Sequence, residues 1–133
     1  MFITTEDIQI EGDDKCQNEF ISSLGEHNVP AKDVILVRAS FAKGEGHGFH
    51  YHDEREEFLY ILQGEVEQWI GEEKKICHAG DIIYVAQGVV HASFNIGDSE
   101  VKLLAIFGNK SSSAELAVDV SDQDPWKSMI MNR

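Results

Sequence analysis

Residues 44–64 decide the fold, and they read GEGHGFHYHDEREEFLYILQG. Within this segment His50 and His52 are two residues apart, so in an extended strand both imidazoles point to the same face. A carboxylate follows at Glu57, and His91 lies in a separate strand-like segment. Three imidazoles and one carboxylate that converge on a point predict a site for a divalent transition metal.

Short apolar runs separated by glycines extend on both sides of this segment. They have the length of strands and are rich in β-branched and aromatic residues, which favours strands over helices. Because no helical pattern lies between them, the sequence predicts an all-β, antiparallel sandwich or barrel. The predicted strands are residues 34–41, 58–62, 66–70, 82–85, 91–96 and 101–107.

The two ends of the chain lack the glycine-separated apolar runs of this middle part. Asp13 or Asp14 can cap a short N-terminal helix that continues to Leu24, and Gly25 can end it. Residues 108–113 read as a loop, residues 114–120 fit either a strand or a short helix, and the tail either docks through Trp126 or frays. We therefore divide the chain into an N-terminal extension (1–33), a barrel (34–107) and a C-terminal extension (108–133) that packs on the barrel or on a partner subunit.

Composition and charge exclude several classes of function. The 133 residues suit one domain, and the net charge of −13 with a pI near 4.7 opposes binding to nucleic acids or anionic membranes. No apolar run approaches the roughly 20 residues of a transmembrane helix, and no signal peptide is visible at the N-terminus. Cys16 and Cys77 match no metal-binding or disulfide spacing. We expect an acidic cytoplasmic protein.

One predicted strand is apolar on both faces, which indicates that its outer face is covered. Residues 58–62 read FLYIL and are apolar on both faces, whereas a strand with one face in water alternates between apolar and polar residues. The outer face therefore packs on something else, either the flanking segments or a second copy of the chain. This pattern favours a homodimer.

Because of these histidines, the glutamate and the glycines around them, the chain resembles a small, single-domain member of the cupin superfamily. The first cupin motif has a glycine, two histidines separated by one residue, a glutamate and a second glycine. Here Gly44, His50, His52, Glu57 and Gly64 match it. The second motif is matched by Gly80, Gly88, His91 and Asn95, whereas Ala86 stands where the family has a proline.

The resemblance implies an antiparallel double-stranded β-helix, or jelly-roll barrel, with a metal ion inside. The family's ligand positions fall on His50, His52, Glu57 and His91, and Glu56 is the alternative to Glu57 because the motif tolerates a shorter spacing. Such a ligand set suits iron, manganese, nickel or zinc. Four protein ligands leave a six-coordinate ion two open positions, whereas a tetrahedral zinc ion would be closed and structural.

Two further residues are candidates for substrate contacts. Arg38 lies in an apolar strand, and it can bind a substrate carboxylate if it faces the interior, or be a surface residue if it faces outward. His47 precedes the ligand histidines in a glycine-rich loop, and we expect it to lie in solvent rather than against the substrate. Three aromatic residues can line the cavity or belong to the core (Trp69, Tyr84, Phe94).

These patterns favour a small metal-dependent enzyme that acts on a small, oxygen-rich organic molecule. Within this class we expect a dioxygenase, because open positions on an Fe(II) centre suit O2 chemistry. The same ligands would serve a metal-dependent isomerase or lyase, and a non-catalytic cupin that binds or senses a metal or small ligand is the alternative. The fold alone cannot separate these functions.

Overall fold

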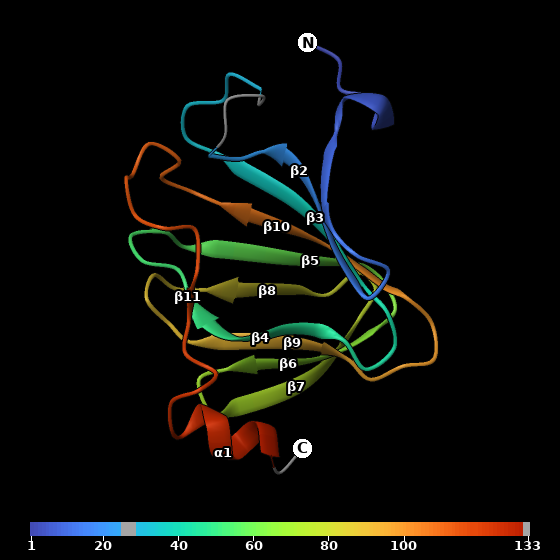
Figure 1. Ribbon diagram of the computed structural model, residues 1–133, viewed down its shortest axis with the longest axis vertical. Helices are drawn as coiled ribbons and strands as arrows, with labels where there is room; N and C mark the ends of the chain where they lie inside the picture. The colour runs from blue at the N-terminus through green and yellow to red at the C-terminus, as the bar shows by residue number, and fades with distance from the viewer. Residues whose placement is uncertain (25–28, 132–133) are drawn as a thin grey trace.

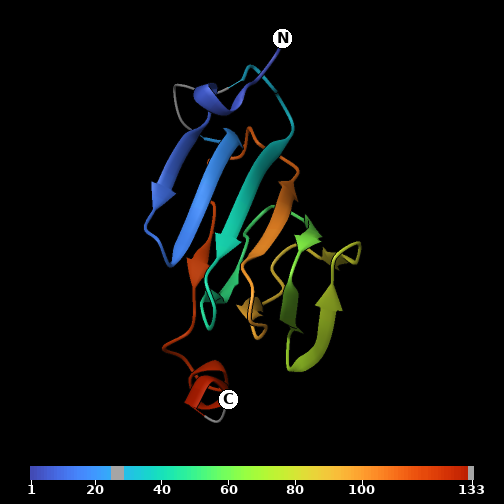
Figure 2. The same ribbon diagram turned by 90° about the vertical axis from the view of Figure 1, so that its right-hand side faces the viewer.

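The computed structural model describes residues 1–24 and 29–131, and it consists of two antiparallel sheets that face each other (Figure 1). Figure 2 shows β1, β2, β3 and β10 side by side in the larger sheet. That six-stranded sheet has the order β1 (Gln9–Gly12), β2 (Cys16–Ser22), β3 (Ile35–Phe41), β10 (Val101–Phe107), β5 (Glu57–Gln63) and β8 (Ile82–Val85). The five-stranded sheet has the order β11 (Val118–Asp119), β4 (Gly46–Tyr51), β9 (His91–Asn95), β6 (Glu65–Ile70) and β7 (Glu73–His78).

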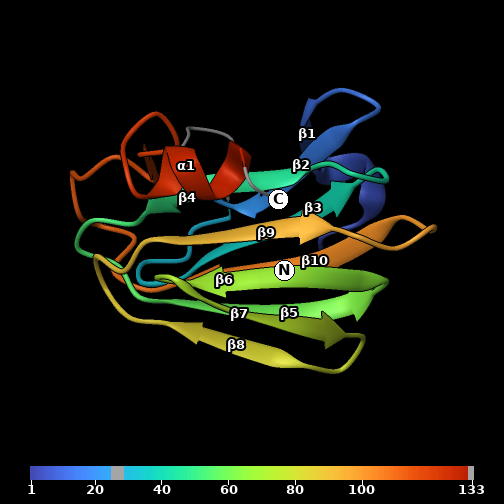
Figure 3. The same cartoon turned by 90° about the horizontal axis from the view of Figure 1, so that it is seen from below.

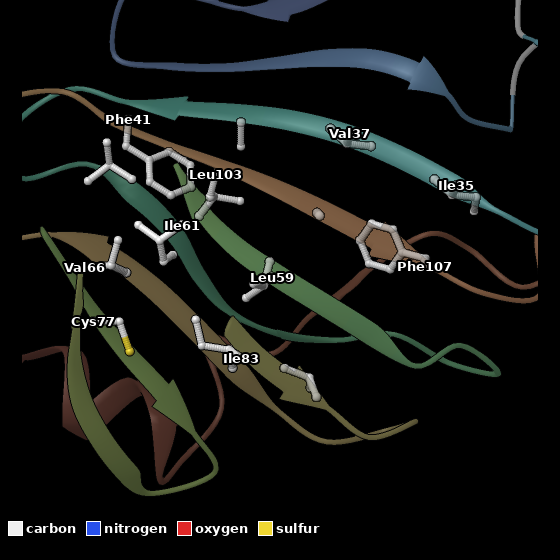
Figure 4. Close-up of a cluster of buried hydrophobic side chains, with 14 residues drawn as sticks. Ile35, Val37, Phe41, Leu59, Ile61, Val66, Cys77, Ile83, Leu103 and Phe107 are labelled. Carbon is white, nitrogen blue, oxygen red and sulfur yellow. The ribbon is translucent and has the colours of Figure 1, made fainter. Parts of the chain in front are cut away.

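The hydrophobic core lies between the two sheets. Along β3 and β10 every second residue is buried, as expected for strands with one face towards a core. Figure 4 shows how side chains from both sheets meet there, with Phe41, Leu103 and Ile61 from the six-stranded sheet near Val66 and Cys77 from the other. This packing holds the strand ends that carry the candidate site.

A second apolar cluster lies on the outer face of the five-stranded sheet, beneath the C-terminal helix α1 (Trp126–Met131) (Figure 3). Phe49 is at its centre, with its ring centroid 5.2 Å from that of Trp126 in a stacked arrangement. Phe94 and Trp69 pack edge-on against the same phenyl ring. The tail therefore docks through Trp126, while the short strand β11 pairs with β4.

The expected N-terminal helix is wrong, because residues 16–22 form strand β2, paired with β3. Phe20, Ile21 and Leu24 fit a helical face, but Cys16 and Phe20 instead pack on the core from alternate positions of a strand. Tertiary pairing has outweighed the local pattern. The only helical turn in this part of the described chain is a 3-10 turn at Thr5–Asp7, and Gly25 lies outside the described residues.

The motif glycines occupy turns that require their conformational freedom. Gly64 has φ +91, and a Cβ there would lie 2.9 Å from a side-chain carbon of Val101. Gly88 has φ +76, so the turn before β9 is kept although Ala86 replaces the family's proline. Asn95 ends β9 by donating hydrogen bonds to the carbonyls of Phe41 and Ser99.

Candidate metal centre

Four side chains from different elements converge at one end of the barrel interior. His50 belongs to β4 and His52 follows it, Glu57 begins β5, and His91 begins β9. The three histidines each offer a ring nitrogen, and these atoms lie within 4.8 Å of one another. His52, Glu57 and His91 are 4, 3 and 1% exposed. The strand pairing therefore brings together all four residues that the sequence indicated.

Each imidazole is oriented by one backbone carbonyl. The Nδ1 atoms of His50, His52 and His91 lie 2.6, 2.6 and 2.9 Å from the carbonyl oxygens of Gly48, Leu116 and Val89. A carbonyl can only accept, so Nδ1 carries the proton in every ring. In the neutral imidazole Nε2 then presents a lone pair, and this is the arrangement that metal-binding histidines use.

The atoms that face one another at the centre have no hydrogen-bond partner. Nε2 of His52, Nε2 of His91 and Oε1 of Glu57 are all buried without one among the described residues. Oε1 of Glu57 nevertheless lies 3.4 Å from Nε2 of His52 and 2.9 Å from Nε2 of His91. Lone pairs this close repel unless a cation lies between them. The donor set fits a divalent ion, because adjacent ligands each about 2.0–2.2 Å from a metal have such separations.

The titration behaviour of the site follows from burial and from these neighbours. Burial lowers the pKa of His50 to about 3 and that of His47 to about 4, so both rings are neutral at pH 7. Burial alone would raise the pKa of Glu57, but the imidazoles of His52 and His91 outweigh it and lower the pKa to about 2. At neutral pH the centre therefore offers the neutral ring of His50 and the ionised carboxylate of Glu57.

The carboxylate in the centre is that of Glu57 and not that of its neighbour. Glu56 lies on the opposite face of the strand, is exposed, and accepts a hydrogen bond of 2.9 Å from the hydroxyl of Tyr84. Glu56 directly precedes β5, and successive residues of an extended chain point to opposite sides.

The C-terminal extension contributes to the site, although no motif in it predicted this role. We call residues 112–116 the C-terminal strap. Its last carbonyl, that of Leu116, orients His52 from 64 positions along the chain. The strap is fixed by Arg55, which is 1% exposed and donates hydrogen bonds to four carbonyl oxygens (Asn109, Ser112, Ala114, Glu115). The one available sign was the position of Arg55 between two candidate ligands, which does not reveal these partners.

A cavity of about 410 Å³ opens from the centre. It is lined by His50, His52 and Glu57 together with residues of β2, β3, β10 and the C-terminal extension. A pocket of this size suits a small organic molecule. The end of the barrel that holds the four convergent side chains is therefore accessible to a ligand.

His47 lines this cavity, so the expectation that it lies in solvent is wrong. The pairing of β4 with β9 shifts register between His47 and His50, which inserts one extra residue into β4. This bulge turns His47 to the same side as His50, and its ring lies against Phe41 with centroids 4.7 Å apart.

Arg38 does not reach the cavity. It lies on the outer face of β3, where its guanidinium binds the carboxylate of Glu19 through two hydrogen bonds of 2.5 and 2.9 Å. Arg38 lies between the buried residues Val37 and Ala39, so its side chain points to the opposite face of the sheet. Among the aromatic candidates, Tyr84 is exposed on the outer face of β8, and Trp69 and Phe94 belong to the cluster around Phe49.

The sequence profile of the cupin domain matches residues 37–107. The chain belongs to the cupin family. Several solved structures share the fold of this cupin at low sequence identity. KdgF from Halomonas sp. has a TM-score of 0.69 and 16% identity, covering 81% of this chain and 92% of that one. An RmlC-like cupin from Shewanella frigidimarina has a TM-score of 0.67 and 20% identity over 80% of this chain and 88% of that one.

A third similar structure is larger. Oxalate decarboxylase OxdC from Bacillus subtilis aligns with a TM-score of 0.69 and 18% identity over 81% of this cupin, which spans 29% of that chain. A search of curated protein sequences returns no match. Within the described residues, no helix combines the length and apolar character that are needed to cross a membrane.

Proposed function

We propose that this cupin is a metal-dependent enzyme in which His50, His52, Glu57 and His91 bind one divalent ion. The observation that supports this most directly is the group of unpartnered, mutually repelling atoms at the base of the cavity, which a cation would stabilise. The ionised Glu57 carboxylate offsets part of the metal charge and leaves a positive centre that attracts oxygen ligands. Manganese is worth testing beside iron, because the structurally similar B. subtilis oxalate decarboxylase is described with Mn(II) centres.

The substrate of the proposed enzyme is a small, oxygen-rich organic molecule. It would enter the cavity and coordinate the ion at positions that the four protein ligands leave open. A bound iron or manganese ion would supply Lewis-acid or redox chemistry, and we favour dioxygenase chemistry with Fe(II). The cavity wall beyond the centre is mainly apolar, and the neutral ring of His47 lies on it where it can hydrogen-bond to a bound substrate.

The proposal is tested by purifying the protein without oxygen, measuring its metal content, and then following O2 uptake with enediols, diketones and catechols. Bound iron with substrate-dependent uptake is the expected result, whereas stoichiometric zinc with no exchangeable position would rule out the oxygenase. His52→Ala should lose most of the metal. The matched control is His78→Ala, because His78 is exposed on β7 and pairs with Glu65. Equal metal content in both variants would overturn the assignment of the ligands.

We also propose that this cupin is a homodimer through the outer face of its six-stranded sheet. Neighbouring strands β5 and β8 expose five large apolar side chains there, each 38–61% exposed (Phe58, Tyr60, Leu62, Ile82, Tyr84). A contiguous apolar patch of this kind is typical of an interaction surface. A second copy would cover it symmetrically.

A further inference from the structure

The wall of the cavity limits the charge of the ligand. Beyond the metal centre it is mainly apolar, and among the described residues that line it none is a lysine or an arginine (the apolar ones are Phe20, Val37, Ala39, Ala105, Phe107, Leu116 and Ala117). The two arginines that lie nearest in sequence are engaged elsewhere, Arg38 with Glu19 and Arg55 with the strap carbonyls. An anionic group placed on this wall would lose its hydration without gaining a partner.

The charge at the metal centre also limits the negative charge that a ligand can carry. A divalent ion with Glu57 would leave one net positive charge, and the carboxylate of Asp119, which also lines the cavity, opposes the entry of anions. A ligand with a single negative charge on its coordinating oxygens can be neutralised there. A second negative charge on the body of the ligand cannot.

One side chain on this wall has a buried polar atom without a partner. Asn18 lies on the inner face of β2, opposite Ala39 and between the core residues Cys16 and Phe20. Its Oδ1 is buried without a hydrogen bond in the described part of the chain, although Asn18 lines the cavity. Asn18 is half-buried, and an amide oxygen that is buried without a partner costs free energy, so a ligand group that lets the amide pair is favoured. A hydroxyl group suits either orientation of the amide, because it both donates and accepts.

We propose that the cavity selects a ligand with an oxygen-chelating head of at most one negative charge and an apolar body carrying a hydroxyl group that binds Asn18. This inference rests on the proposed function, since the chelating head requires the metal. It excludes compact dianions such as oxalate as preferred ligands. Asn18 is then a specificity-determining residue contributed by the N-terminal extension.

Probes that share one chelating head isolate the contribution of the wall. Benzohydroxamate, its hydroxylated derivatives and its 4-carboxylated derivative can each be titrated into the Mn(II)-loaded protein by calorimetry. We expect the carboxylated probe to bind at least about tenfold more weakly than the parent, because its charge is desolvated without a partner. At least one hydroxylated isomer should bind about three- to tenfold more tightly than the parent, which is the range of one net hydrogen bond.

The variant Asn18→Leu should abolish the difference in affinity between the hydroxylated isomer and benzohydroxamate. Gln17→Leu is the matched control, because Gln17 is the neighbouring residue on β2 and does not line the cavity. The comparison among probes on the unmodified protein does not depend on how the variants fold. Equal or tighter binding of the carboxylated probe, or a hydroxyl gain that survives in Asn18→Leu, overturns the inference.

The metal measurement separates this inference from the proposed function. If the protein binds neither Mn(II) nor Fe(II), as judged by metal analysis before any probe is added, the proposed function fails and this inference fails with it. If Mn(II) binds but the probes are not discriminated, only the inference about the wall fails.

Discussion

Each histidine of the centre donates Nδ1–H to one backbone carbonyl, and the carboxylate of Glu57, whose pKa is lowered to about 2, is ionised at neutral pH. In the absence of a metal this charge is buried 2.9 Å from the lone pair of His91. The residue that most favours a bound cation is therefore also unfavourable for the metal-free fold. This opposition gives a prediction in which affinity and stability change in opposite directions.

Glu57→Gln should lower metal affinity by roughly 100-fold, since loss of outer-shell partners alone costs about 10- to 100-fold. The same variant should make the metal-free protein at least as stable as the original, because an amide can donate to the unpartnered Nε2 atoms. Chelator competition and urea unfolding measure the two quantities. Glu56→Gln is the control and should change neither the metal affinity nor the stability. If Glu57→Gln binds metal as tightly as the original protein, Glu57 is not a ligand.

The stability of the metal-free protein should fall as the pH decreases below about 6.5, the ordinary pKa of histidine. The folded-state pKa is lowered to about 4 for His47 and to about 3 for His50, so below pH 6.5 the unfolded chain binds more protons than the folded one. Each histidine then removes up to about 1.4 kcal/mol per pH unit.

Urea unfolding of protein treated with a chelator, at pH 7.5, 6.5 and 5.5, measures this dependence. A flat profile between pH 6.5 and 5.5 would show that the two histidines are not buried as neutral rings. Protein that retains its metal should need a lower pH to reach the same loss, because protons must displace the ion from the imidazoles.

At the scale of elements, the C-terminal strap connects the fold to the site. Arg55 binds its carbonyls, and the Leu116 carbonyl at its end holds the ring of His52. Arg55→Met should lower the free energy of unfolding by about 3 kcal/mol, since it leaves buried carbonyls without donors. It should also weaken metal binding, because His52 loses its fixed orientation.

Arg38→Met provides the matched control for this variant. Arg38 makes a partly exposed pair with Glu19, and such pairs contribute less than about 1 kcal/mol. Thermal unfolding and metal titration of both variants distinguish the two roles. Similar losses in both would mean that the strap does not depend on Arg55.

Strands with regular alternation were predictable from the sequence, and elements without it were not. β3, β5, β8 and β10 alternate or are apolar throughout, and the sequence located them within a residue or two. β7 was missed because only Cys77 in it is buried, so its pattern is almost entirely polar. β2 was taken for a helix because its pairing with β3, which local sequence does not encode, determines its conformation.

The same distinction applies to the site. The four convergent side chains were predictable because motif spacing places them on known strand faces. The inward turn of His47 depends on a bulge, and the roles of Asn18, Arg55 and Leu116 depend on contacts between segments far apart in the chain. Side-chain periodicity carries no information about such contacts.

At the scale of the whole molecule, the exposed apolar face of β5 and β8 predicts a dimer. Tyr60→Glu should convert the protein to a monomer, because a carboxylate buried in an apolar interface lacks a partner. Light scattering coupled to size-exclusion chromatography measures the mass. Ile76→Glu is the control, since Ile76 is similarly exposed on β7 in the other sheet. A monomeric original protein would contradict the proposal directly.

The strap also has a consequence for synthesis of the protein on the ribosome. Leu116 is synthesised 64 residues after His52, and its carbonyl orients the His52 ring. A nascent chain that has already exposed His50, His52, Glu57 and His91 therefore still lacks the contact that fixes one of them. Under the proposed function, tight metal capture should be confined to chains in which Leu116 has been synthesised and lies against His52. Incomplete translation products would then exchange metal freely with the cell's pool.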